Sequence, residues 1–187
     1  MKLRNTLSVF IIGVLLVSCA KQQARKPVSQ TSGSFIEESI ARNKTLIANE
    51  EKLIKFIISK DTLKQYVASS KGYWYKYDFK NVEDSLFPKK GDVAFFEYEI
   101  SDLKNNIIYT KEELKPQTYY VDKQDIMMGL RDGIKLMKKG ETVTFLFPSH
   151  MAFGYHGDNE KISENEPLIC KVTLNDFTEV ASTTKLN

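Results

Sequence analysis

The sequence holds few side chains of the kinds that break or transfer covalent bonds. It has two histidines, His150 and His156, and two cysteines, Cys19 and Cys170. Neither histidine has a cysteine or carboxylate at the spacing of a zinc site, so both are expected to be solvated loop residues, and no metal is expected. Phosphate-binding loops, dinucleotide-binding glycine patterns and nucleophile elbows are also absent from the sequence. The sequence therefore argues against hydrolysis and group transfer, and we expect no cofactor.

Rotation about an X-Pro peptide bond is a reaction that needs none of these groups. Its barrier of roughly 20 kcal/mol is the lost resonance of the amide, and the rotation moves no proton. A protein can lower this barrier by desolvating the amide and binding the twisted form in an apolar pocket with aromatic walls. Aromatic and aliphatic side chains are therefore the candidates for such a site.

The elements that would position these side chains lie mainly in residues 125–177. Apolar residues recur at helical spacing over 130–137, and Gly140 follows two lysines where a helix is expected to end. Residues 141–147 and 168–177 alternate apolar and polar side chains, as strands with one buried face do. This order predicts a short helix lying on an antiparallel sheet.

Residues before this stretch supply the other strands. Strands are predicted at 73–79, 93–100 and 107–121, the last with a charged break. The predicted fold class is α+β, with an antiparallel sheet of about five strands wrapped on one short helix. This domain is expected to span residues 68–180 and to be followed by a frayed tail at 181–187.

The order and spacing of residues 70–177 resemble the FKBP-type peptidyl-prolyl cis-trans isomerases. The resemblance rests on a Pro88 and a Gly91-Asp92 pair before the strand at 93–100, and on the helix and strands that follow. It implies an FKBP-like fold, rotamase activity and proline-containing polypeptides as substrates.

The resemblance also implies which residues form the site. Tyr98 falls on a pocket tyrosine of the family and Tyr109 on a pocket phenylalanine. Ile126 and Met127 match a Val-Ile pair, whose second residue offers its backbone amide to the bound peptide. Leu130 stands where many members have a tryptophan as the pocket floor.

Three further pocket positions and one departure follow from the same match. Phe153 replaces a tyrosine whose hydroxyl binds the ligand, Ile162 matches an isoleucine on the loop over the pocket, and Cys170 replaces a phenylalanine at its rear. Thr110 stands where the family has an aspartate. The lost hydroxyl and carboxylate predict reduced activity and weak binding of immunosuppressant macrolides.

Pattern alone leaves a plainer explanation for several of these positions. Tyr98, Leu130 and Cys170 fit an ordinary buried core, in which Cys170 is a small hydrophobe without metal-binding or nucleophilic chemistry. Phe153 is flanked by small residues in a loop, where an aromatic side chain more often lines a cleft.

Residues 1–18 have a basic start and an apolar core, and a Leu-Val-Ser-Cys sequence ends at Cys19. This pattern resembles a bacterial lipoprotein signal peptide cut before Cys19, which would then carry acyl chains such as palmitate. A transmembrane helix is the alternative, but it needs roughly 20 apolar residues. The pattern predicts a lipid anchor in the cell envelope that faces the periplasm. The outer membrane is favoured because no acidic residue follows Cys19.

Residues 19–33 are polar and predict a flexible tether. Isoleucines then recur at helical spacing from Ile36 to Ile54, which predicts an amphipathic helix over 34–58 within a helical segment 34–67. The apolar stripe of this helix fits packing on its own domain and a homodimer equally well.

The charge of the chain is nearly balanced. There are 27 Lys and Arg against 24 Asp and Glu, for a net charge of +3, and Lys2 and Arg4 of this excess lie in the leader. No nucleic-acid partner is expected.

Two functions remain open from the sequence. The first is a lipid-anchored isomerase that helps exported proteins fold, because the leader and N-terminal helix resemble FKBP-type lipoproteins associated with gliding motility. The alternative is a catalytically weak FKBP-like chaperone or binding module of an envelope machine.

Overall fold

The computed structural model describes residues 32–62 and 65–180. The chain divides into two units at Ile40, and the unit from Ala41 onward contains the sheet. The strands are β1 (Val67–Ala68), β2 (Trp74–Phe79), β3 (Val93–Asp102), β4 (Ile107–Tyr109), β5 (Gln117–Tyr120), β6 (Thr142–Phe147) and β7 (Leu168–Thr178). The helices are α2 (Ser32–Lys60), α3 (Lys111–Leu114) and α4 (Met128–Gly133), with single 3₁₀ turns η1 (Ile134–Leu136), η2 (Ser149–Met151) and η3 (Gly154–His156).

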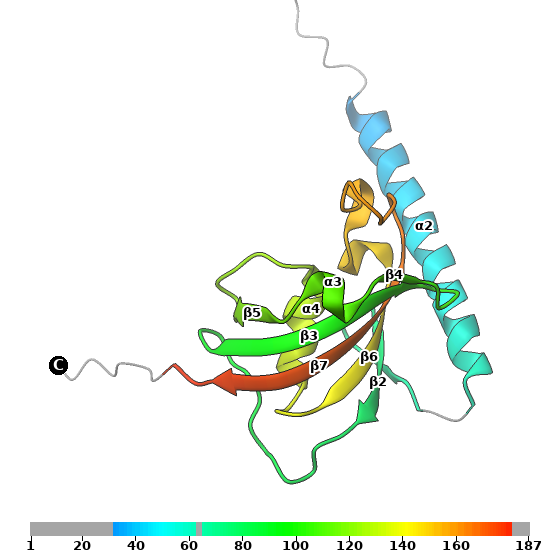
Figure 1. The fold of residues 1–187 in the computed structure, drawn as a ribbon. Helices are drawn as coiled ribbons and strands as arrows, with labels where there is room; N and C mark the ends of the chain where they lie inside the picture. The colour runs from blue at the N-terminus through cyan, green and yellow to red at the C-terminus, as the bar shows by residue number, and fades with distance from the viewer. Residues whose placement is uncertain (1–31, 63–64, 181–187) are drawn as a thin grey trace, which may run out of the picture. The chain divides into compact units, whose positions relative to one another are not determined.

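The seven strands form one antiparallel sheet in the order β1-β2-β6-β7-β3-β4, and β5 also pairs with β3 (Figure 1). The α+β fold class is confirmed, with seven strands where about five were expected. The two additional strands are the short β1 and a second strand within residues 107–121. The charged break in the strand predicted at 107–121 is the helix α3, which separates β4 from β5.

The boundaries of the helical segment 34–67 are corrected at both ends. Helix α2 begins at Ser32, inside the predicted tether 19–33, and ends at Lys60. Val67 and Ala68 instead pair with Tyr75 and Trp74 of β2. This short edge strand forms because it pairs with β2, and the local sequence at 61–67 does not indicate that pairing.

Helix α4 and turn η1 pack on one face of the sheet and form the core with it. Phe145 and Phe147 of β6 are fully buried, and their rings stack at 5.3 Å with an interplanar angle of 7°. Both rings contact the backbone of α4 at its two glycines: a Cβ on Gly129 would lie 2.5 Å from Phe147, and one on Gly133 would lie 2.8 Å from Phe145. The glycines therefore let the helix approach the sheet closely.

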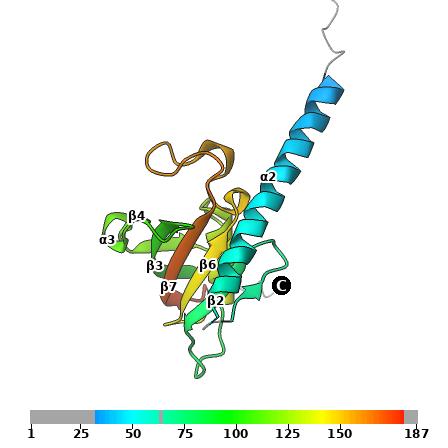
Figure 2. The ribbon, with the colours of Figure 1, turned by 90° about the vertical axis from the view of Figure 1, so that its right-hand side faces the viewer.

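The part of α2 from Ala41 onward belongs to the same unit as the sheet. Ile54 is fully buried, and Lys55 Nζ lies 5.6 Å from the centre of the Trp74 ring on β2. Figure 2 shows this end of α2 beside β2. Leu53 and Phe56 remain exposed on the helix.

Several sequence predictions fall outside the described residues. These are the signal peptide at 1–18, the acylated Cys19, most of the tether and the tail at 181–187. Within residues 32–62 and 65–180, none of the helices combines the length and apolar character of a membrane span.

Candidate active site

An aromatic hollow of about 570 Å³ opens beside strands β3 and β4, helix α3 and the segment that joins β6 to β7. Tyr98, Tyr109 and Phe153 supply its aromatic side chains, and Ile100 and Leu114 add aliphatic ones. The charged residues on it are Glu113, Asp158, Glu160 and Lys161. The structure therefore brings together three of the eight predicted site residues, from three separate elements.

The other five predicted site residues lie against the same core. Leu130, Ile162 and Cys170 are buried within it, and Ile126 and Met127 are half-buried and packed on its surface. None of the five lines the hollow itself. Their role in the site stays a prediction.

Tyr98 and Cys170 are neutral groups in this environment. Burial, with a smaller contribution from nearby Cys170, raises the pKa of Tyr98 to about 12. Burial alone raises the pKa of the Cys170 thiol, which is completely enclosed. A thiol held in its protonated form is a poor nucleophile, so Cys170 contributes volume to the core.

The loop after η3 supplies a carboxylate that the sequence analysis missed. The Tyr109 hydroxyl donates to Asp158 Oδ2 at 2.5 Å, and Glu160 Oε2 lies 3.3 Å away. Asp158 Oδ1 accepts from the backbone amides of Glu160 and Ile162, each at 2.8 Å. Asp158 therefore ties the loop to strand β4.

These bonds set the ionisation of both partners. The bond to Asp158 and, next, burial raise the pKa of Tyr109. Burial would raise the pKa of Asp158, but the bonds from Tyr109 and the loop amides outweigh it and lower that pKa. Asp158 is thus a carboxylate and Tyr109 a neutral donor at physiological pH.

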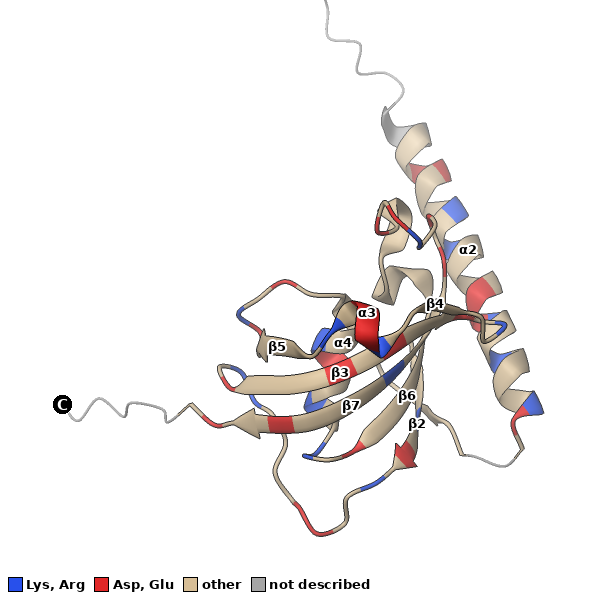
Figure 3. Ribbon diagram, viewed as in Figure 1, with Lys and Arg blue, Asp and Glu red and all other residues tan. Residues whose placement is uncertain are grey.

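Lys161 makes a second connection across the hollow. Its Nζ lies 4.6 Å from the centre of the Tyr109 ring, donates to Ile108 O at 3.3 Å and pairs with Glu113 of α3. Figure 3 shows the acidic residues of α3 at this edge of the sheet. The pairing with Lys161 lowers the pKa of Glu113.

Thr110, which stands where the family has an aspartate, caps the N-terminus of α3. Its hydroxyl accepts from the Glu113 amide at 3.3 Å, and Glu113 Oε2 accepts from the Thr110 amide at 2.9 Å. This capping box starts α3. The carboxylate that contacts the pocket aromatic is therefore Asp158, which lies 49 positions from Tyr109 in the sequence.

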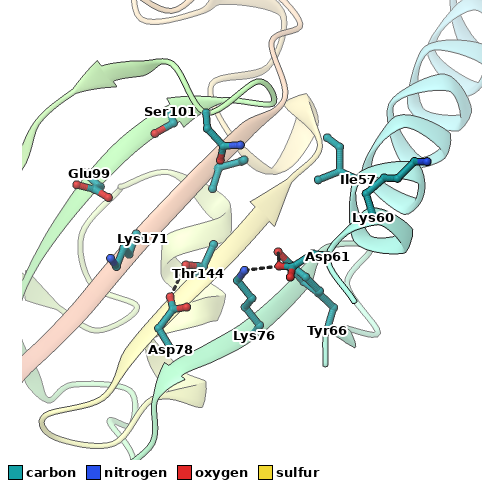
Figure 4. Close-up of a pocket in the computed structure, with 12 residues that line it drawn as sticks. Ile57, Lys60, Asp61, Tyr66, Lys76, Asp78, Glu99, Ser101, Thr144 and Lys171 are labelled. Atoms are coloured by element: carbon teal, nitrogen blue, oxygen red, sulfur yellow. Dashed lines mark hydrogen bonds and ion pairs between the residues drawn. The ribbon is translucent and has the colours of Figure 1, made fainter. Parts of the chain in front are cut away.

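A second groove of about 430 Å³ lies on the other side of the sheet, next to the end of α2 (Figure 4). Three of its charged residues have polar partners: Lys76 Nζ lies 2.7 Å from Asp61 Oδ2, and Thr144 donates to Asp78. Tyr66 is its one aromatic lining residue. An amide would be poorly desolvated here, so the aromatic hollow is the better candidate for an active site.

The described residues of the hollow suit recognition of a neutral, apolar group. No cluster of three or more His, Cys, Asp or Glu residues that would hold a metal ion occurs in the described chain. The aromatic walls can exclude water from a bound peptide, and the polar groups at the rim can hold its backbone. This arrangement fits a change of conformation better than a transfer of atoms.

Comparisons with known proteins agree with this geometry. Residues 85–175 match the family model described as FKBP-type peptidyl-prolyl cis-trans isomerase. A curated relative, the probable FKBP-type peptidyl-prolyl cis-trans isomerase FkpA of Neisseria meningitidis serogroup B, is 24% identical over 155 residues, which are 83% of this chain and 55% of that protein. The chain thus spans about half the length of this relative.

Two solved structures share the fold. The crystal structure of a peptidyl-prolyl cis-trans isomerase from Pseudomonas syringae pv. tomato has a TM-score of 0.58 and 14% identity, covering 73% of this chain and 96% of that one. The crystal structure of FkpA from Escherichia coli has a TM-score of 0.58 and 19% identity, covering 94% of this chain and 82% of that one. At these identities the likeness concerns the fold alone.

Proposed function

Because residues 85–175 belong to the FKBP-type peptidyl-prolyl cis-trans isomerase family, we propose that this chain accelerates the cis-trans isomerisation of X-Pro bonds in polypeptide substrates. The observation that carries the proposal is the aromatic hollow formed by Tyr98, Tyr109 and Phe153. An X-Pro amide bound there leaves water, which favours the twisted transition state because that state has lost the charge separation of amide resonance.

The direct test is an NMR exchange or protease-coupled assay of cis-trans conversion in a short X-Pro peptide with the purified full chain. We expect acceleration that saturates with peptide concentration. A folded and monodisperse protein that leaves the uncatalysed rate unchanged would overturn the proposal.

A binding module is the second candidate, and the connections across the hollow favour it. The bonds from Tyr109 to Asp158 and from Lys161 to Glu113 join the loop to the opposite wall. Phe153 also has no hydroxyl to donate to a bound chain. A module of this kind would bind proline-containing or unfolded chains without changing the rate of isomerisation, so binding and rate measurements on the same peptide separate the two.

We further propose that the chain is lipid-anchored through Cys19 and faces the periplasm, with exported envelope or gliding-motility proteins as substrates. The leader pattern in residues 1–19 supports this proposal. Mass spectrometry of the mature N-terminal peptide tests it: an acylated Cys19 is expected, and an unmodified or uncleaved N-terminus contradicts it.

A homodimer through α2 is a separate proposal. Its support is a series of large apolar side chains that α2 exposes, namely Phe35, Ile36, Ile40, Leu53 and Phe56. We expect sedimentation of the full chain in detergent to give a dimer, and replacement of Leu53 and Phe56 by serine to give monomers. A monomeric wild-type chain would contradict this proposal and leave the isomerase proposal untouched.

The proposed reaction should show little pH dependence near neutrality. The reaction moves no proton, the raised pKa values of Tyr98 and Tyr109 keep both hydroxyls neutral, and the pKa of Asp158 is lowered from 3.8. The contribution of the Asp158 carboxylate is fully present above its unfolded pKa and is lost as the pH falls through its lower folded pKa. We expect kcat/KM to vary by less than about twofold from about pH 5 to pH 9 and to fall only at more acidic pH.

The Asp158→Asn variant tests the contribution that the Asp158 carboxylate makes to this pH profile. It should lower kcat/KM severalfold at neutral pH, because its amide oxygen is a weaker acceptor for the Tyr109 hydroxyl. A bell-shaped profile centred near neutrality in the wild-type chain would show that a proton-transfer group has been missed.

A further inference from the structure

Glu50 is a buried carboxylate on α2 that the proposed reaction does not use. Its exposed fraction is 4%, and that of its partner Ser149 is 2%. Glu50 Oε2 accepts from the Ser149 amide at 2.8 Å, and Oε1 accepts from the Ser149 hydroxyl at 2.8 Å. A carboxylate taken out of water is costly unless donors of this kind hold it. The two residues, 99 positions apart, therefore fix one another.

Ser149 begins the segment that ends at the pocket residue Phe153. Turn η2 starts at Ser149, with the Met151 amide donating to Pro148 O at 2.9 Å and the Ala152 amide donating to Ser149 O at 3.0 Å. Met151 enters the core, and Phe153 lines the aromatic hollow. The position of Ser149 thus helps to determine the position of the Phe153 side chain in the hollow.

The packing beside this bond is incomplete. A cavity of about 230 Å³ lies between the α2 residues Leu46 and Ile47 and the segment that carries Ser149, His150 and Tyr155. Close packing is what ordinarily fixes a segment of this kind. Because the cavity removes part of that contact, the two hydrogen bonds to Glu50 add to the anchoring that the buried Met151 gives the segment.

We propose that Glu50 is a positioning residue for the isomerase pocket. Through Ser149 it holds the segment from Pro148 to Phe153, so that the ring of Phe153 stays on the pocket wall. Helix α2 is in this way part of the support of the pocket, and a displacement of the helix at Glu50 is transmitted to Phe153. The activity readout of this inference rests on the proposed isomerase function, whereas its structural readout does not.

The test uses the full chain and five variants. Glu50→Ala removes both acceptors, Ser149→Ala removes one donor, and the double variant closes a thermodynamic cycle. Glu50→Gln is the conservative variant, because its amide can accept from the Ser149 amide and donate to the Ser149 hydroxyl. Glu51→Ala is the matched control, since the neighbouring Glu51 pairs with Lys55 at the surface.

Two quantities are measured for each variant: kcat/KM for an X-Pro peptide, and hydrogen exchange of the Met151 and Ala152 amides against those of β6 and β7. We expect Glu50→Ala to lower kcat/KM about tenfold and to speed exchange at Met151 and Ala152 but not in β6 or β7. Glu50→Gln and Glu51→Ala should stay within about twofold of wild type. The double variant should be no worse than Glu50→Ala.

Three results would overturn the inference. They are wild-type behaviour of Glu50→Ala in both measurements, an equal loss of protection throughout β6 and β7, and additive effects of Glu50→Ala and Ser149→Ala. If Glu50→Ala does not fold, the milder Ser149→Ala variant decides between selective and general loss of protection. If the wild-type chain does not isomerise peptides, the proposed function fails, while the exchange rates still test the position of the segment.

Discussion

Replacing Gly129 by alanine is expected to destabilise the chain by about 2–3 kcal/mol. In an ordinary helix this change would stabilise by up to about 1 kcal/mol, because alanine has the higher helix propensity. Here the new Cβ would lie 2.5 Å from the Phe147 ring, which is fully buried and packed against the rings of Tyr73 and Phe145. The steric clash therefore outweighs the propensity. Urea unfolding followed by circular dichroism measures the difference.

Gly140→Ala is the comparison for this substitution. Gly140 has a φ of +79°, so alanine there is strained by about 1–2 kcal/mol, but its Cβ would meet no atom within 4 Å. We expect Gly140→Ala to cost less than Gly129→Ala. A stabilised Gly129→Ala variant would mean that α4 does not approach β6 as closely as the structure shows.

The close approach of α4 also bears on the site. Ile126 and Met127 precede the helix, and Leu130 lies on its buried face. Helix α4 would have to move away from the sheet to accommodate a Cβ at Gly129, and these three residues would move with it. If these three residues belong to the site, as the resemblance implies, activity is expected to fall in Gly129→Ala even under conditions where the variant remains folded.

The fold was predictable from the sequence wherever a strand buries only one of its two faces, because its side chains then alternate between apolar and polar. Alternation in 141–147 and 168–177 identified β6 and β7, and the buried positions Leu168, Cys170, Val172 and Leu174 follow the expected period of two. β6 is less regular, because Thr144 and Leu146 are buried on its opposite face as well. The short elements β1 and α3 escaped prediction. β1 is defined by its pairing with β2, and α3 by a single capping box in a charged stretch.

The site was predictable only in its aromatic part. Tyr98, Tyr109 and Phe153 were identified from the resemblance to the FKBP-type family, and they do line one hollow. The polar partners are different, because Asp158 and Lys161 contact residues of β4 and α3 about 50 positions away. The one local signal was Gly157 before Asp158, which marks a turn. Gly157 has a φ of +63°, and a Cβ there would lie 2.2 Å from Ile162 O.

The contact between Glu50 and Ser149 shows the same limit more clearly. A glutamate on an amphipathic helix is ordinarily solvated, and the spacing of Glu50 does not distinguish it from Glu51. Only the fold places a serine amide and hydroxyl within 2.8 Å of its carboxylate. Polar contacts between distant segments are set by the backbone geometry of both, which local periodicity does not encode.

Replacing Tyr98 by alanine is expected to lower kcat/KM for an X-Pro peptide about 30- to 100-fold, which corresponds to about 2–3 kcal/mol of transition-state stabilisation. Tyr98 lies on β3 with its ring 5.5 Å from that of Phe96, and it lines the aromatic hollow. Without the ring, water can reach a bound amide and the twisted form loses its apolar contact. The same NMR exchange assay measures the loss.

Tyr98→Phe and Tyr120→Ala are the matched variants for this prediction. Tyr98→Phe keeps the ring and loses only the hydroxyl, so we expect kcat/KM to stay within about threefold of wild type. Tyr120→Ala removes an exposed tyrosine of β5 that does not line the hollow, and it should leave activity unchanged. Since Tyr98→Ala also removes core contacts, its unfolding curve must show that the variant is folded at the assay temperature. A folded Tyr98→Ala variant with wild-type kcat/KM would exclude this hollow as the site of isomerisation, because the loss of one of its three aromatic rings would then have no effect.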